Sequence, residues 1–358
     1  MSAIERDALW VRLRDAGLVT GAAPAAAPES GTWYIRAMVG AAAWIAAVFL
    51  LVFVGLGLHE LVRTSGAAMI AGLIACAIAA TMLRMANGTF VEQLGLALSL
   101  TGQALFALGA LGLLRGHGLP GAAETFTIAA FEALLVIVVP GFVHRVFCTL
   151  AAAFALCYAL EAAGLGRLGL PLLTALFVGV ALDDARLARF PRSWPPVGIG
   201  LALAIIAVQL AQIGVDELGL WRPRRDAPVL GRWYADGAMG AVFFGAVTWI
   251  VAKAGVDQRA PAGIAALTGA FALAIAAVWI PGLAAGLLIV LVGFATGQRP
   301  LTGLGIIALL AALSRYYYTL STTLLVKSAA LFATAALLLV LGFVLHRAAE
   351  GAGEDRDA

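Results

Sequence analysis

The chain has 358 residues, of which 63% are hydrophobic and only 12% are charged, whereas about a quarter of the residues in an ordinary soluble domain are charged. This composition excludes a soluble globular protein as the default class. The net charge of +3 comes from basic residues scattered singly between apolar runs, which excludes the concentrated basic surface that nucleic-acid binding requires. A bilayer is therefore the expected surrounding of most of this chain.

Residues 1–36 form a polar leader ahead of the apolar part of the chain. Ser2 and Glu5 have the spacing of a capping box, which predicts a short amphipathic helix that ends near Gly17. Such a helix lies on a membrane surface or docks on a neighbour, and a simple tether is the alternative. Residues 20–31, which are rich in alanine and contain two prolines, predict a linker.

Residues 37–346 predict an all-α, polytopic membrane domain of about 12 transmembrane helices, because apolar runs near the length of a span follow one another without strand-like alternation. Two of the runs are short, which leaves tilted helices, re-entrant segments and continuations of a neighbour open. A short polar tail, residues 347–358, follows. The expected spans are 38–57, 66–83, 94–114, 125–140, 146–163, 168–182, 197–214, 237–254, 262–280, 282–297, 301–314 and 328–346, and 168–182 and 301–314 are the short ones.

The distribution of Lys and Arg predicts the orientation of these spans. If the spans alternate, fourteen basic residues lie on the side of the N-terminus and nine on the other side. Because basic residues resist translocation, both termini are expected in the cytoplasm. The connection 215–236 would then face outward, and its aromatic residues are typical of a cap at the membrane interface. The first apolar run is too long for a cleavable signal peptide, so we expect an uncleaved anchor.

Glu132 is an ionisable residue inside an expected span, where a charge is costly unless it finds a partner or water. One interpretation makes it a proton or cation site. The other makes it a structural carboxyl that bonds to a neighbouring helix. A pairing of Glu132 with Lys327 is a sharper version of the second interpretation.

Glu92, Gln93 and Gln103 open and line the third expected span. Eleven helical residues return nearly to the same face, so Glu92 and Gln103 could share one polar seam. Such a seam can line a water path, but amides between membrane helices also serve simply to hold the helices together.

His144 and Cys148 have the i, i+4 spacing that places two soft metal ligands on one helix face. Two ligands do not make a metal site, and the three cysteines include no CxxC pair. No motif of a nucleotide site, a serine hydrolase or a zinc protease is present. We therefore expect no metal, no cofactor and no catalytic residue.

Arg315 is followed by three consecutive tyrosines, Tyr316, Tyr317 and Tyr318. Consecutive residues point in different directions around a helix, so these rings favour an aromatic belt at the membrane interface over a stacked platform for a ligand.

Several segments resemble the bacterial membrane family called domain of unknown function 4401. They are TWYIRAMVGAAAWIAAVFLLVF (32–53), FVEQLGLALSLTGQALFALGALG (90–112), VPGFVHRVFCT (139–149) and SRYYYTLSTTLLVK (314–327), and LWVRLRDAGLV (9–19) is similar to the N-terminal helix of that family. The resemblance implies a polytopic protein of the bacterial inner membrane, whose gene often accompanies one for a protein with a GDYXXLXY domain. It implies no reaction, ligand or catalytic residue.

The shared segments give weight to the polar residues that they contain, and Glu132 lies outside them. The polar and aromatic residues that the shared segments single out are Trp33, Tyr34, Arg36, Glu92, Gln93, Gln103, His144, Arg145, Arg315, Tyr316, Tyr317, Tyr318 and Lys327.

We therefore expect a non-enzymatic membrane component that associates with another envelope protein. One alternative is a secondary transporter or ion-coupled permease that uses Glu132 or the seam of Glu92 and Gln103. Another is a membrane-embedded enzyme acting on lipid. In that scheme two basic residues, Arg315 and Lys327, hold a headgroup phosphate, and Glu92 or His144 is the base.

Overall fold

The computed structural model describes residues 10–17, 64–85, 88–118, 121–183, 194–218, 231–279 and 282–319, together with isolated positions elsewhere. Side chains are described in these ranges except at 89, 212–218, 231–233, 279 and 315–319. The long elements are α3 (Ser65–Met85), α4 (Thr89–Gly116), α5 (Gly121–Val138), α6 (Phe142–Ala162), α7 (Gly169–Leu182), α9 (Trp194–Leu218), α10 (Gly231–Lys253), α11 (Pro261–Trp279), α12 (Leu283–Ala295) and α13 (Arg299–Thr319), and a 3-10 turn, η1 (Gly166–Leu168), precedes α7.

Each of the ten expected spans between residues 66 and 314 corresponds to a helix. Among the described residues, seven helices are long and apolar enough to cross a membrane, namely α3, α4, α5, α6, α9, α10 and α11. The prediction of about 12 spans is not confirmed. Two of the twelve, 38–57 and 328–346, lie outside the described ranges, and α7 and α12 have only 14 and 13 residues. Helices of that length reach about 20 Å, short of a hydrocarbon core of about 30 Å.

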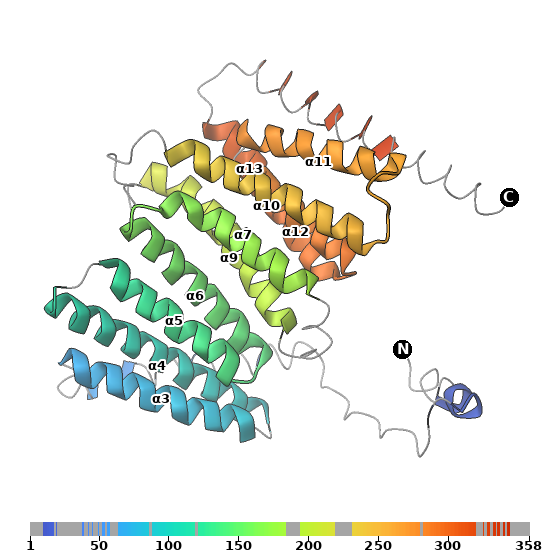
Figure 1. Cartoon of the computed structure of the whole chain (residues 1–358). Helices are drawn as coiled ribbons and strands as arrows, with labels where there is room; N and C mark the ends of the chain where they lie inside the picture. The colour runs from blue at the N-terminus through green and yellow to red at the C-terminus, as the bar shows by residue number, and fades with distance from the viewer. Residues whose placement is uncertain are drawn as a thin grey trace.

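The helices form a bundle that extends from α3 at one end to α11 at the other (Figure 1). One core lies among α3, α4, α5 and α6, and a larger core lies among α6, α7, α9, α10, α11, α12 and α13. The short helices α7 and α12 pack on α9 and α10, and more than half of their residues are buried. Because protein surrounds them, they need not match the bilayer thickness.

The outer surface of the bundle is apolar. On α3, for example, Ile70, Leu73, Ile74 and Ile78 are exposed and lie on adjoining faces of the helix. A water-soluble protein rarely exposes so large an apolar surface, whereas lipid solvates it well. The chain is therefore an all-helical membrane protein.

Helices α3 and α4 approach each other closely along a line of glycines. Gly95, Gly102 and Gly109 of α4 recur every seven residues and therefore share one face. A Cβ on Gly102 would lie 2.6 Å from the Cys76 sulfur, and one on Gly109 would lie 2.5 Å from the Met69 nitrogen. The glycines allow the two backbones to meet.

A similar contact joins α12 to α13. A Cβ on Gly286 would lie 2.9 Å from the Leu309 side chain, and one on Gly293 would lie 2.5 Å from the Thr302 nitrogen. Gly282, four residues before Gly286, and Gly297, four residues after Gly293, instead have positive φ angles of 91° and 67° at the ends of α12.

Basic side chains bond to helix carbonyls at one end of the bundle, which we call the basic end. Arg84 donates to the Val138 carbonyl at 2.8 Å and Arg145 to the Val136 carbonyl at 3.0 Å, both in the last turn of α5. Lys253 donates to the Leu182 carbonyl at the end of α7. Cations at helix C-termini satisfy free carbonyls and complement the helix dipole. These contacts place the C-terminal ends of α3, α5, α7 and α10 together.

In the polar leader, the structure describes residues 10–17, and the expected capping box at Ser2 and Glu5 lies outside them. Residues 10–15 are helical, and Gly17 has a φ of 67°, as expected of a glycine that ends a helix. The linker 20–31 and the tail 347–358 lie outside the described residues.

Candidate functional site

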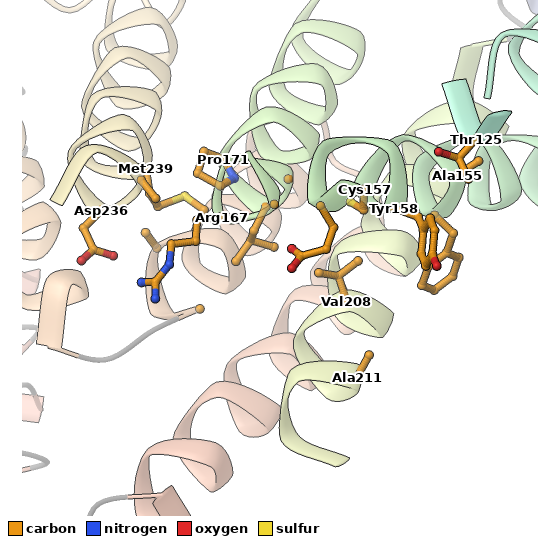
Figure 2. Close-up of a pocket in the computed structure, with 18 of the residues that line it drawn as sticks. Thr125, Ala155, Cys157, Tyr158, Arg167, Pro171, Val208, Ala211, Asp236 and Met239 are labelled. Carbon is orange, nitrogen blue, oxygen red and sulfur yellow. The ribbon is translucent and has the colours of Figure 1, made fainter. Parts of the chain in front are cut away.

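A pocket of about 900 Å³ opens at the end of the bundle opposite the basic end. It is lined by the C-terminal turns of α4, α6, α9 and α11 and by the N-terminal turns of α5, α7, α10 and α12. Its walls are mostly small and apolar, with Ala155, Pro171, Val208, Ala211 and Met239 among them (Figure 2). The volume is typical of sites for small molecules or for part of a lipid.

Charged and polar side chains interrupt these apolar walls. They are Arg115, Tyr158, Glu161, Arg167 and Asp236. Figure 2 shows Tyr158, Arg167 and Asp236 on separate helices and turns around the pocket. Both signs of charge are present, so the site suits a molecule with an apolar part and a head that carries opposite charges.

Arg115 is already engaged with a partner at the edge of the pocket. Its Nε donates to the Glu124 carboxylate at 3.0 Å, and the Glu124 side chain is only 4% exposed whereas that of Arg115 is 68% exposed. Glu124 lies in the first turn of α5, where the helix dipole favours a negative charge. Arg167, Glu161 and Asp236 have no ion-pair partner among the described residues.

A second group of polar side chains is buried between α4, α5 and α6, and we call it the buried polar cluster. It contains Ser99 and Gln103 of α4, Glu132 of α5, and His144 and Cys148 of α6. Gln103 Nε2 donates to Ser99 Oγ at 3.1 Å and to Cys148 Sγ at 3.3 Å. Ser99 Oγ lies 2.8 Å from His144 Nε2, and Cys148 Sγ lies 3.6 Å from the two ring nitrogens of His144.

Glu132 completes this cluster, because its carboxyl group interacts with the Cys148 thiol. Glu132 is 3% exposed, and its Oε2 has no hydrogen-bond partner. On α5 it follows Ile128 by four residues, and Ile128 lines the pocket. The cluster therefore lies about one helical turn, some 6 Å, beyond the pocket wall.

The structure brings together only some of the polar residues that the sequence selects. Gln103, Glu132 and His144 meet in the buried polar cluster. Glu92 is exposed and Gln93 is half-buried near the start of α4, so Glu92 does not share a buried seam with Gln103. Glu92 also lies seven residues, about 10 Å along the helix, from Ser99, which contacts His144. Glu92 and His144, the two bases considered for a lipid enzyme, therefore do not lie in one cavity.

The remaining selected residues are basic or aromatic. Arg145 is bound to the α5 carbonyl at the basic end. The backbone of Arg315, Tyr316, Tyr317 and Tyr318 forms the last turns of α13, but their side chains lie outside the described residues, so the aromatic belt stays a prediction. The predicted pairing of Lys327 with Glu132 involves a residue outside the described ranges.

His144 and Cys148 do share a helix face, as their spacing predicts. Among the residues that the structure describes, no group of three His, Cys, Asp or Glu side chains could hold a metal ion. The neighbours of this pair are instead Ser99 and Gln103, which satisfy its hydrogen bonds.

Sequence reasoning missed Ser99 and the charges of the pocket. Ser99 precedes Gln103 by four residues, the same spacing that relates His144 to Cys148, and two such pairs on neighbouring spans are a signal of facing polar patches. The charged residues of the pocket could have been found at the ends of the expected spans. Arg115, Glu161, Arg167 and Asp236 all flank apolar runs on one predicted side of the membrane.

A comparison with known families gives one match. A family model described as "Domain of unknown function (DUF4401)" matches residues 32–348, nearly the whole chain. The chain belongs to the DUF4401 family. No curated protein and no solved structure matches it. The matched residues include those of both the pocket and the buried polar cluster of this DUF4401 protein.

Proposed function

We propose that this protein is a non-enzymatic component of a bacterial inner membrane that binds a zwitterionic amphipathic lipid in the pocket. The single observation that supports this proposal is the pocket itself, with its volume of about 900 Å³, its apolar walls and its rim of opposite charges. Binding sites for small molecules combine apolar walls with a few placed polar groups in this way.

The charged side chains of the rim that have no ion-pair partner among the described residues favour a lipid head group with one negative and one positive charge. Arg167 is suited to a phosphate, because a guanidinium donates several hydrogen bonds to phosphate oxygens. Glu161 and Asp236 are suited to an ammonium group. The apolar walls formed by Phe154, Leu170 and others would take the upper part of an acyl chain, and phosphatidylethanolamine has this chemistry.

Binding of lipid is tested by filling the pocket. The protein is purified in mild detergent, and binding of a fluorescent phosphatidylethanolamine is measured for the wild type, A155W and A211W, both of which would place an indole in the pocket. We expect at least tenfold weaker binding for these two variants. The matched control is A123W, on the shallow outer face between α5 and α6, which should bind as the wild type does. Equal binding by all four proteins would contradict the proposal.

The head-group preference has its own test. R167A should lose most of its affinity for phosphatidylethanolamine and for phosphatidylglycerol, since both contain a phosphate. D236N should weaken binding of phosphatidylethanolamine alone, because only that lipid has an ammonium group. A wild-type protein that prefers phosphatidylglycerol would contradict the assignment of a zwitterionic ligand.

We also propose that both termini face the cytoplasm and that an envelope protein with a GDYXXLXY domain is the partner. The basic residues favour that orientation, in which the pocket opens to the outer side where such a partner could reach it. Co-purification in detergent, followed by mass spectrometry, should recover this partner with the wild type. Recovery should fall when residues 221–234 are replaced by a Gly/Ser segment of the same length, and an unchanged yield would contradict the predicted role of that connection.

A further inference from the structure

The buried polar cluster is not used by lipid binding, and its centre is a carboxyl group. Glu132 is 3% exposed, and the residues beside it on α5, Phe131 and Ala133, are apolar. One of its oxygens has no hydrogen-bond partner. An ionisable group in such surroundings is costly to retain unless it has a role.

The groups that face Glu132 from each neighbouring helix carry no positive charge that pairs with it. On α3 the nearest titratable group is the Cys76 thiol, and on α4 the facing side chains are the uncharged Ser99 and Gln103. On α6 they are His144 and Cys148.

Arg145, also on α6, is the nearest permanent cation in sequence to this cluster, but it is committed to the Val136 carbonyl. Within the described part of the chain, Glu132 therefore has no salt bridge.

An unpaired carboxylate in this environment would be strongly disfavoured relative to the neutral acid. We propose that Glu132, Cys148 and His144 form a proton-binding site inside the membrane domain, with Glu132 carrying the proton. This inference goes beyond the proposed function and does not depend on it.

His144 supplies the acceptor for that proton. Gln103 donates one amide hydrogen to Ser99 and the other to Cys148, so it donates none to His144. A neutral imidazole carries one N–H and keeps one nitrogen as an acceptor, and the ring lies in contact with both Ser99 and Cys148.

Cys148 connects the acid to the base. Its thiol interacts with the Glu132 carboxyl group and lies 3.6 Å from the ring nitrogens of His144. When the Glu132 proton moves to the sulfur, the original thiol proton moves to His144. The products are a carboxylate, an unchanged thiol and an imidazolium, so protons and charge balance without another reactant.

Infrared difference spectroscopy of the full-length protein in lipid nanodiscs tests the protonation of Glu132 directly. A protonated carboxyl has a C=O stretching band that is separate from the carboxylate bands and shifts in D₂O. We expect the spectrum of the wild type minus E132Q at neutral pH to contain this band. The matched control is E124Q. Glu124 is equally buried on the same helix but is paired with Arg115, so its difference spectrum should contain carboxylate bands instead.

A second variant keeps the test informative if E132Q does not fold. C148A removes the thiol that interacts with Glu132, so the C=O band should remain but shift in frequency, and one S–H stretching band should disappear. C157A, which changes a buried thiol outside the cluster, should remove an S–H band and leave the C=O band unshifted.

The opposite results would overturn the proposal. Carboxylate bands alone in the wild type minus E132Q spectrum would mean that Glu132 is ionised beside a cation. The appearance of a protonated band in K327M would then identify Lys327 as that cation. An unshifted C=O band in C148A would remove Cys148 from the site.

Discussion

Ser99 of α4 and His144 of α6 lie 45 residues apart in the chain, yet their side chains are joined by a contact of 2.8 Å. The hydroxyl also accepts a hydrogen bond from Gln103. One small residue therefore connects two helices through two buried polar partners. Such groups are costly when they lose a partner, because no water is available to replace it.

We predict that S99A destabilises the protein by about 1–2 kcal/mol, since it leaves His144 and Gln103 each short of one partner. Unfolding by SDS in mixed micelles measures the change. T127A is the control, because the exposed Thr127 hydroxyl bonds only to the Ala123 carbonyl of its own helix, and its effect should stay below about 0.5 kcal/mol. Equal effects of the two substitutions would show that the contact with His144 adds no stability.

The close approach of α3 and α4 predicts a strong effect of one added methyl group. In G102A the new Cβ would lie 2.6 Å from the Cys76 sulfur and 2.8 Å from the Gly72 carbonyl oxygen, so the helices must separate. We expect a loss of about 1–3 kcal/mol, as for overpacked cores, measured as a lower midpoint of thermal unfolding in detergent. G66A on α3 meets no atom within 4 Å and should be neutral or slightly stabilising. A G102A protein as stable as the wild type would contradict the observed close approach of α3 and α4.

The ion pair at the edge of the pocket predicts non-additive substitutions. R115M would leave the Glu124 carboxylate, which is buried, without its partner, and should destabilise the protein by roughly 1–3 kcal/mol, between the values for surface and buried pairs. The double variant R115M/E124Q should recover part of that loss, because no unpaired charge remains. A double-mutant cycle based on SDS unfolding measures this coupling, and simple additivity would mean that the pair is not formed.

The two ends of the bundle predict which residues are labelled from each side of the membrane. Glu161 lies at the pocket end, and Asp257 follows α10 at the basic end. In a C157A background, whose remaining cysteines are buried, E161C should react with an impermeant maleimide added to intact spheroplasts. D257C should react only after permeabilisation. The reverse pattern would assign the opposite orientation.

A reporter fused after Ala358 provides an independent check of the same orientation. An enzyme that is active only after export should be inactive at this position, because the C-terminus is predicted in the cytoplasm.

Much of the fold could be predicted because it depends on short-range properties of the chain. Each apolar run between residues 66 and 314 became a helix, since a backbone in lipid must satisfy its hydrogen bonds within its own segment. Length alone did not establish which helices cross the bilayer. A span was expected over 282–297, but α12 begins after Gly282, which has a positive φ, and α12 is buried among other helices.

The buried polar cluster could be predicted only in part. The spacing of His144 and Cys148 correctly placed both on one face, and the cost of a buried charge drew attention to Glu132. The 11-residue spacing suggested that Glu92 and Gln103 share a polar seam, but Glu92 is exposed, and Gln103 is buried and bonds to Ser99 and Cys148. Periodicity fixes which residues share a face but leaves open which face is turned inward.

By itself the sequence determined that this protein is helical, that it belongs in a bilayer and that its charges gather near the ends of spans, because composition and run length act locally along the chain. The tertiary structure alone decided that Glu132 meets Cys148, that α7 and α12 are enclosed by other helices, and that eight helix ends surround one pocket. Those features depend on the rotation of each helix about its axis and on the close approach that glycines such as Gly102 permit.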